Sequence, residues 1–179
     1  MPLEKREKPE MNNPSTCQDR YWKELYQLRV HVNYLELYME QSEFIDKSVN
    51  IFLAVTSSSS ICGWAIWNKF GFIWAVIIAA SQLVSAVKQF LPYRTRQKAI
   101  SGILREFEEL LTFYEMKWFD VAEGNLTNAE INKLQYEMRS KKTKILHKHL
   151  GANTLPTKGK LFNKAKDTAT TYINNFYGG

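Results

Sequence analysis

The chain has 179 residues and a net charge of +6. The charge is uneven, because residues 99–128 contain two basic and six acidic side chains whereas residues 129–179 contain ten basic and three acidic ones. Such a basic balance is typical of proteins that bind nucleic acid or an anionic membrane surface. The sequence has no glycine-rich phosphate loop, nucleophile elbow or zinc motif, so we expect neither an enzyme nor a cofactor.

The N-terminal part predicts a disordered segment followed by a long helix. Residues 1–14 combine three prolines with mixed charge, and their alternating Lys, Arg and Glu side chains predict no cleavable signal peptide. Over residues 15–47 the apolar positions follow heptad spacing, at Tyr21, Leu25, Leu28, Val32, Leu35 and Met39. This pattern predicts an amphipathic helix that pairs with another helix. Because no Gly or Pro occurs from Ser15 up to Gly63, we expect it to continue into the next segment as one helix of about 50 residues.

Two stretches without formal charge follow, at residues 48–68 and 70–87, with Lys69 between them. A helix of about 20 residues spans a hydrocarbon core of about 30 Å. We therefore expect transmembrane helices over residues 48–68 and 70–90, joined by the turn-prone segment from Asn68 to Gly71 into a tight antiparallel hairpin. The alternative is a buried helical hairpin in a soluble protein.

Aromatic and basic side chains flank the predicted spans as interfacial anchors. They are Trp64, Trp67 and Trp74 near the turn, and Lys88, Arg94 and Arg96 at the end of the second span. Because the basic residues follow the second span, the positive-inside rule places both termini in the cytoplasm of a multi-pass inner-membrane protein. Cys17 would then lie in the cytoplasm and Cys62 in the membrane, so we expect no disulfide.

Small and hydroxylated residues interrupt the spans, at Thr56, Ser57, Ser58, Ser59, Ser60, Gly63, Ser81 and Ser85. In a bilayer such hydroxyls must bond the carbonyl four residues earlier or a neighbouring helix, and small residues at i and i+4 let helices approach closely. These residues either pack the two helices of one hairpin or face a neighbouring subunit or a wet pore. Ser57 to Ser60 sweep about 300° around a helix, so they cannot all face one lumen.

Residues 95–150 predict helices that return along the first one. After Pro92, which marks a kink or a restart, heptad spacing resumes at Ile100, Leu104, Phe107, Leu111, Tyr114, Trp118 and Val121. This stripe and the first are nearly symmetric about Lys69, which predicts an antiparallel pair, although a heptad stripe serves pairing within or between chains equally well.

A further helix is predicted from the capping box Thr127–Glu130 to Gly151, with Ile131, Leu134, Met138 and Ile145 on one side, and it would complete a three-helix bundle. In the basic tail, residues 151–179, we expect a linker with Pro156 and Gly159 and a short amphipathic helix. That helix would carry Leu161, Phe162, Ala165, Tyr172, Ile173 and Phe176.

Few polar clusters predict chemistry. His147 and His149 form a His-x-His pair without a nearby third ligand, so we expect no metal site. His31 is interpreted as a surface or packing residue, and Glu106, Glu108 and Glu109 as a solvated face. The spans contain no ionisable residue except at their ends, which argues against coupled transport.

The arrangement of the helix with Tyr21 to Met39, the hairpin, and the returning stripes Ile100–Val121 and Ile131–Ile145 resembles the SLATT family of bacterial two-transmembrane-helix proteins. The likeness covers roughly residues 19–150, concerns architecture, and supplies no catalytic residues. It implies a pore-forming or membrane-disrupting effector in phage defence or bacterial conflict, acting beside a nucleotide-signalling or sensor protein. The lysine-rich tail from Lys158 onward is not explained by it.

We therefore expect an all-α membrane protein, in which a two-helix transmembrane hairpin continues as a cytoplasmic antiparallel helical bundle. Its partners would be the lipid bilayer and further copies of the chain, with no nucleic acid. The expected function is an inner-membrane effector that oligomerises and breaches the membrane. The alternative is a membrane-anchored scaffold that forms no pore and recruits a cytosolic partner through its helical arms.

Overall fold

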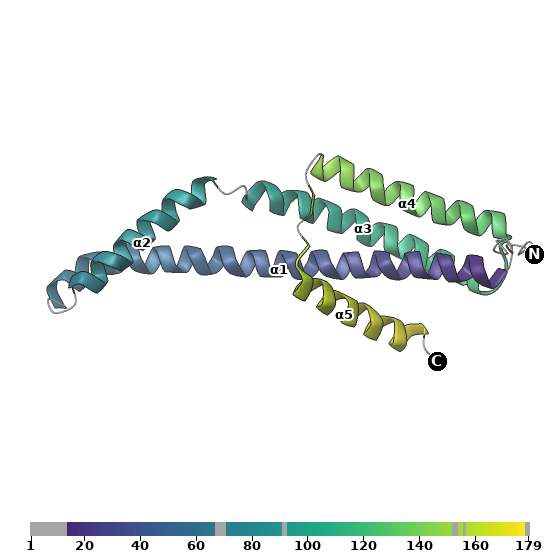
Figure 1. Ribbon diagram of the computed structural model, residues 1–179, viewed down its shortest axis with the longest axis horizontal. Helices are drawn as coiled ribbons and strands as arrows, with labels where there is room; N and C mark the ends of the chain where they lie inside the picture. The colour runs from purple at the N-terminus through teal and green to yellow at the C-terminus, as the bar shows by residue number, and fades with distance from the viewer. Residues whose placement is uncertain (1–13, 67–70, 91–92, 152–153, 156, 178–179) are drawn as a thin grey trace, which may run out of the picture. The chain divides into compact units, whose positions relative to one another are not determined.

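The computed structural model describes residues 14–66, 71–90, 93–151, 154–155 and 157–177, without the side chains of residues 14–16, 58–66, 74, 88–90 and 93–94. Throughout these ranges the regular structure is α-helical, which confirms the all-α class. The helices are α1 (Pro14–Ile66), α2 (Gly71–Phe90), α3 (Tyr93–Ala122), α4 (Asn128–Leu150) and α5 (Gly159–Tyr177) (Figure 1). The chain divides into unit 1, made of Met1–Glu36 and Ser101–Gly179, and unit 2, made of Leu37–Ile100.

Helix α1 is unbroken over 53 residues, as the lack of Gly and Pro from Ser15 to Cys62 predicts. In unit 1 it runs antiparallel to α3. The Gln18 side chain donates to the Val121 carbonyl at 2.8 Å, and the Tyr21 hydroxyl donates to the Tyr114 carbonyl at 2.9 Å. The midpoint in sequence between Gln18 and Val121 lies within about one residue of Lys69. This is the symmetry about Lys69 that the two stripes predict. The stripes therefore pair within this chain.

The core of unit 1 is formed by the predicted stripes together with two positions outside them. Most of the stripe residues are buried, whereas Met39, Leu104, Trp118 and Leu134 are partly exposed, and Met39 and Ile100 fall in unit 2. Ile103 and Leu110 are also buried, because α3 is covered on a second side. A strict heptad stripe describes a helix with one partner, and α3 has more than one.

The turn between α3 and α4 is specified by local hydrogen bonds. Gly124 has φ 74°, and Asn125 N–H donates to the Asp120 carbonyl while Gly124 N–H donates to the Val121 carbonyl, which is the Schellman arrangement. Helix α4 then begins with the predicted capping box, in which Thr127 and Glu130 bond each other's backbone N–H. It ends where predicted, with the N–H of Gly151 donating to the His147 carbonyl.

Glu24 joins α4 to α1. Its carboxylate is buried and accepts from Arg139 Nε at 2.7 Å and from Lys142 Nζ at 3.1 Å. Burial raises the pKa of Glu24, but the hydrogen bonds from Arg139 and Lys142 outweigh it, so the pKa lies below its ordinary value. The apolar stripe of the sequence does not include Glu24, so it gives no sign that a charged residue is buried on α1. The role of Glu24 depends on its partners on α4.

Glu106 joins α4 to α3, which corrects the interpretation of this residue as part of a solvated face, whereas Glu108 and Glu109 are exposed as that interpretation predicts. Its carboxylate accepts from Lys148 Nζ at 2.7 Å and lies 2.6 Å from His149 Nε2. Hydrogen bonds from Lys148 and His149 lower the pKa of Glu106. Gly102 makes room for this contact, because a Cβ at that position would overlap the imidazole of His149. Neither histidine of the His-x-His pair belongs to a group of three or more metal-ligating side chains among the described residues.

Helix α4 joins α1 and α3 as predicted, but α5 also belongs to unit 1 and packs on α1, so the predicted three-helix bundle is extended by a fourth helix. Asn33 of α1 donates to the Ala165 carbonyl at 3.4 Å, and Ala165 and Ala169 are buried. The guanidinium of Arg29 lies 3.6 Å from the centroid of the Tyr172 ring and bonds Glu115 of α3 at 3.1 Å. The amphipathic pattern of the tail indicates a helix, but it does not say whether the apolar side meets a membrane or the bundle.

Unit 2 contains the second half of α1, α2 and the first residues of α3. Helix α2 ends at Phe90 and α3 begins at Tyr93, on either side of Leu91 and Pro92, which lie outside the described residues. Among the residues that the structure describes, no helix combines the length and the apolar character needed to cross a bilayer.

The two core tyrosines give a matched test of the α1–α3 packing. Tyr21→Phe should lower the free energy of unfolding by about 1 kcal/mol, because it removes the donor to the Tyr114 carbonyl. Tyr114→Phe should leave stability unchanged or raise it, since the buried Tyr114 hydroxyl has no hydrogen-bond partner in the described part of the chain. Burial also raises the pKa of Tyr114 to about 12. Denaturant titrations followed by circular dichroism measure both, and an equal loss in the two variants would contradict the assignment.

Glu24 gives a pH-dependent test. Glu24→Gln should lower the free energy of unfolding by about 1 to 2 kcal/mol near pH 7, a modest loss because Arg139 is largely exposed. With its native pKa lowered, the charge of Glu24 contributes stability above the ordinary value of 4.5, and this contribution disappears as the pH falls through the lower native pKa. The difference between the wild type and Glu24→Gln should therefore close in acid. If the difference in the free energy of unfolding between the wild type and Glu24→Gln stays the same in acid, the charge of Glu24 does not contribute to stability.

Candidate functional site

The surface of unit 2 exposes many large apolar side chains. They are Phe44, Ile45, Ile51, Phe52 and Val55 on α1, and Phe72, Ile73, Val76, Ile78, Leu83 and Val87 on α2, each between 38 and 83% exposed. At about 100° per residue, Phe72, Val76, Leu83 and Val87 fall on one side of α2 within about 60°. Phe44, Ile51 and Val55 form a similar band on α1. We call these two bands, with the neighbouring residues just named, the apolar surface of unit 2.

The buried side of unit 2 is polar by comparison. Ser42, Thr56 and Ser81 are 6, 7 and 9% exposed. The Thr56 hydroxyl donates to the carbonyls of Phe52 and Leu53 at 2.9 and 3.1 Å. The Ser81 hydroxyl donates to the Ile78 carbonyl at 2.8 Å. The hydroxyls of Thr56 and Ser81 are thus satisfied within their own helices, which is the arrangement needed where water is absent.

The buried hydroxyls of α1 lie on the register of its core stripe. Positions seven residues apart along α1 are Tyr21, Leu28, Leu35, Ser42, Val49, Thr56 and Gly63. We call this set the α1 seam. The first three members are fully buried in unit 1, Ser42 and Thr56 are buried in unit 2, and Val49 is partly exposed. On α2 the corresponding inward side carries Ile77, Ser81 and Val84. The α1 seam therefore keeps its spacing while its side chains change from large and apolar to small.

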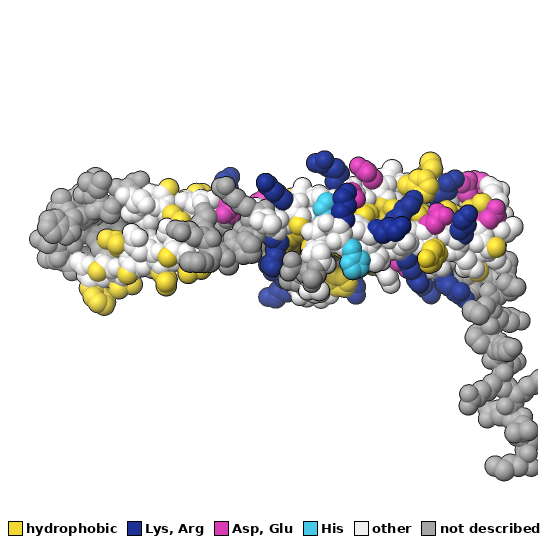
Figure 2. Space-filling model, turned by 90° about the horizontal axis from the view of Figure 1, so that it is seen from above, with side chains coloured by type: hydrophobic (Ala, Val, Ile, Leu, Met, Phe, Trp, Pro, Cys, Tyr) yellow, Lys and Arg dark blue, Asp and Glu magenta, His cyan; other side chains and the backbone are white. Residues whose placement is uncertain are grey.

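Charge is distributed in the opposite way. Figure 2 shows Lys, Arg, Asp and Glu side chains crowded over the helices of unit 1, whereas the described surface of α2 and of the end of α1 is mostly hydrophobic or uncharged. In unit 1 the apolar residues are inside and the charges outside. In the described part of unit 2 the buried side chains are Tyr38 and Ile100 together with the small polar Ser42, Thr56 and Ser81, whereas eleven large apolar side chains are exposed. This partial inversion makes the apolar surface of unit 2 the candidate functional site.

The structure separates the residues that the sequence groups together. Thr56 is buried, whereas Ser57 is exposed and donates to the Leu53 carbonyl at 2.7 Å. Ser81 is buried and Ser85 is exposed. Arg96, predicted as an anchor, is exposed. The side chains of Ser58, Ser59, Ser60, Trp64, Trp74, Lys88 and Arg94, the surroundings of Gly63, and all of Trp67 lie outside the described residues.

Ser42 belongs to the site and was missed, because it precedes the uncharged stretch that begins at residue 48. The signal that finds it is the seven-residue spacing from Leu28 and Leu35. A serine at such a position interrupts the apolar stripe. A search that follows the seven-residue spacing, and does not require an apolar side chain at each position, includes Ser42.

The inward position of Thr56 and the outward position of Ser57 give a matched pair of variants. Thr56→Leu should overpack the α1 seam and lower the free energy of unfolding by about 1 to 3 kcal/mol. Ser57→Leu should be neutral or stabilising, because that side chain is exposed. Thermal unfolding of the full chain in detergent, followed by circular dichroism, compares the two. If both variants behave alike, the α1 seam is not a packing surface.

Comparison with protein-family models, curated proteins and solved structures finds no match. The resemblance to the SLATT family therefore stays a prediction from the arrangement of helices.

Proposed function

We propose that the chain is an inner-membrane effector whose hairpin, formed by the second half of α1 and by α2, enters the bilayer, oligomerises and breaches it. The observation that supports this most is the partial inversion of unit 2, with large apolar side chains outside and hydroxyls inside. The spans would also draw on residues 58–70 and 88–90, whose side chains lie outside the described part of the chain.

Lipid is the environment that best accounts for the apolar surface of unit 2. Covering a half-exposed Val, Ile, Leu or Phe gains on the order of 1 kcal/mol, and this surface carries eleven of them. Monomeric soluble proteins rarely expose contiguous apolar patches of this kind. A groove-binding partner would cover one band, whereas acyl chains cover both bands together. In lipid, helices associate through small residues and internally bonded hydroxyls, which are the residue types of the α1 seam in unit 2.

Oligomerisation is the step that we assign to the hairpin. Ser85 and Ser57 are small, exposed and outside the inward faces, so they offer a second helix close approach to another copy. No Asp, Glu, Lys or Arg occurs within residues 48–68 or 70–87, so the hairpin lacks the groups of a proton or ion-coupled carrier. Breach of the bilayer by an assembly requires none. The nucleotide-signalling or sensor partner would supply the trigger, as the resemblance implies.

The alternative scaffold loses its main support because unit 1 buries the heptad stripes within the chain. One observation still favours it, since Met116 and Phe119 of α3 are 55 and 58% exposed and could contact a cytosolic partner. Replacing both by Ser should leave membrane damage intact under our proposal. If the double variant abolishes function and a stoichiometric partner is lost from pulldowns, while membranes stay sealed throughout, the scaffold is the better description.

The proposal predicts membrane damage that depends on the α1 seam. Purified protein reconstituted into vesicles of bacterial phospholipid should release an entrapped dye. Thr56→Leu should reduce the release severalfold, because it disturbs the small-residue packing, while Ser57→Leu serves as the control for added hydrophobicity. Equal amounts of the variants must be recovered in the vesicle fraction. Sealed vesicles at all protein densities, and growth arrest of expressing cells with intact membrane potential, would remove membrane breach as the function.

Orientation is tested separately. In intact cells a membrane-impermeant maleimide should label a cysteine placed at Lys69, which lies between the spans, and should not label one placed at Arg96 until the cells are opened. Native Cys17 cannot report orientation, because it is fully buried in unit 1. Labelling at Arg96 but not at Lys69 in intact cells would reverse the topology.

A further inference from the structure

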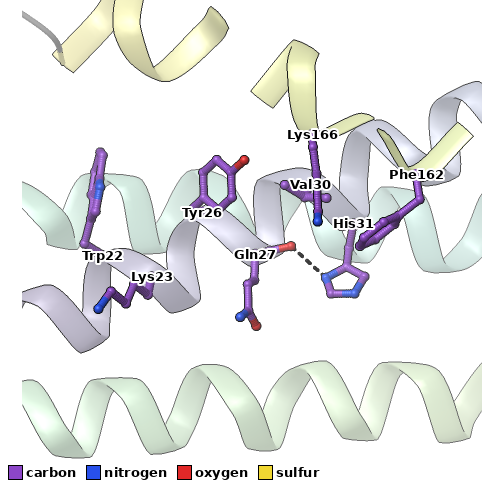
Figure 3. Close-up of a pocket in the computed structure, with 8 residues that line it drawn as sticks. All are labelled: Trp22, Lys23, Tyr26, Gln27, Val30, His31, Phe162 and Lys166. Atoms are coloured by element: carbon purple, nitrogen blue, oxygen red, sulfur yellow. Dashed lines mark hydrogen bonds between the residues drawn. The ribbon is translucent and has the colours of Figure 1, made fainter. Parts of the chain in front are cut away.

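A groove in unit 1 lies between α1 and α5 and has a volume of about 660 Å³, within the range of small-molecule sites. Its lining residues are Trp22, Lys23, Tyr26, Gln27, Val30 and His31 from α1, and Phe162 and Lys166 from α5 (Figure 3). In Figure 3 the side chains of Phe162 and Lys166 extend from α5 toward His31. The groove thus exists because α5 is docked.

Three aromatic side chains line the groove, and each is held by a neighbour outside it. The Trp22 ring lies 4.6 Å from that of Trp118 and 5.3 Å from that of Tyr177, measured between centroids. The Tyr26 hydroxyl is 3.1 Å from the hydroxyl of Thr170. Phe162 packs edge-on against Tyr34 at 6.0 Å. Rings fixed in this way offer flat apolar surface at little cost in conformational entropy on binding.

The charges in the groove are all of one sign. Lys23 and Lys166 are exposed lining residues, and none of the eight lining residues is acidic. Lys166 Nζ lies 4.9 Å from the centroid of the Phe162 ring, so the cation and the aromatic surface meet at one place. Lysine ammonium groups next to aromatic rings match a ligand that carries both a negative group and a flat ring.

His31 adds a directional contact. Its Nδ1 is 2.7 Å from the Gln27 carbonyl, and because a carbonyl only accepts, Nδ1 carries the proton. In the neutral ring Nε2 is then an acceptor, and in the protonated ring it is a second donor. Burial lowers the pKa of His31, and the charge of Lys142 on α4 lowers it further, while the Gln27 carbonyl and Glu24 raise it. A bound anion would favour the protonated form.

We propose that this groove binds an aromatic anion of nucleotide size, with the ring against Trp22, Tyr26 or Phe162 and the anionic group at Lys166 beside His31, while Lys23 adds positive charge at the other end of the groove. Because the lining residues come from two helices, the ligand holds α5 against α1 and stabilises the docked state. This site is independent of the membrane function, and its test uses binding and stability alone.

Isothermal titration of the full chain in detergent with AMP and GMP tests the proposal, with adenosine as the ring without the charge and pyrophosphate as the charge without the ring. AMP or GMP, or both, should bind more tightly than adenosine and more tightly than pyrophosphate. Lys23→Ala with Lys166→Ala should weaken binding by about tenfold or more, since charge-assisted contacts are lost. The control Lys144→Ala with Lys164→Ala removes two exposed charges outside the groove and should bind normally. Bound nucleotide should also raise the unfolding temperature of the wild type.

Two results would overturn the proposal. One is a lack of binding of both nucleotides at millimolar concentration. The other is pyrophosphate binding as tightly as the nucleotides with equal loss in both double variants, which would indicate only a basic surface.

The pH dependence tests the place of the ligand next to His31. Relative to His31→Gln, the affinity of the wild type should rise as the pH falls through the titration of His31, because the phosphate titration of the ligand is common to both proteins. The other charged neighbours of His31 are Lys142, Glu24, Lys23 and Lys166. His31→Gln keeps a donor for the Gln27 carbonyl but has no charge to gain, so it should lose the part of the pH dependence that exceeds the ligand's own phosphate titration. Identical pH profiles in the two proteins would place the anion away from His31.

Discussion

The α1 seam is the constraint on which the rest of the structure depends. Positions seven residues apart on one unbroken helix are buried in both units. The side chains that pack against these positions must therefore match their size and polarity. Where the members are Tyr21, Leu28 and Leu35, the opposing surface is an apolar core closed by α3, α4 and α5. Where they are Ser42 and Thr56, the inward side chains are small, and the Thr56 hydroxyl bonds carbonyls of its own helix. One seven-residue repeat thus serves two kinds of packing. On the outer side of the helix the change is the reverse, because charged side chains in unit 1 give way to large apolar side chains in unit 2.

Contacts of charged side chains on α1 hold α3, α4 and α5 in place against this helix. Glu24 faces inward and is acceptable there only because Arg139 and Lys142 reach it from α4. Arg29 is held between Glu115 and the Tyr172 ring, so it connects α1 with α3 and α5. Removing Arg139 and Lys142 would leave the buried Glu24 carboxylate without compensation, which makes these contacts specific for one arrangement of the bundle. The apolar residues provide most of the attraction, and the charged ones select among the ways of packing.

Much of the fold could be predicted from local pattern, and the site only in part. The long helix, the antiparallel pairing of the stripes, the capping box at Thr127 and the stop at Gly151 each follow from spacing or from one residue's backbone preference. The packing of α5 could not be predicted, because an amphipathic helix has the same sequence whether its apolar side meets lipid or protein. The hydroxyl cluster was grouped by adjacency, but neighbours in a helix point about 100° apart, and burial divides Thr56 from Ser57. The contact of His149 with Glu106 depends on the empty space at Gly102, and such a shape is invisible in a one-dimensional pattern.

The Thr56 hydroxyl has a mechanical consequence. It donates to two carbonyls, those of Phe52 and Leu53, which also serve the backbone ladder of α1. A shared acceptor bonds each donor less firmly, and threonine contacts of this kind are a known source of helix bending. Ser57 engages the Leu53 carbonyl as well, so two side chains compete with the backbone at one turn. The elastic stiffness of α1 should therefore be reduced between Phe52 and Ser57, and strain applied to the helix would appear there as curvature.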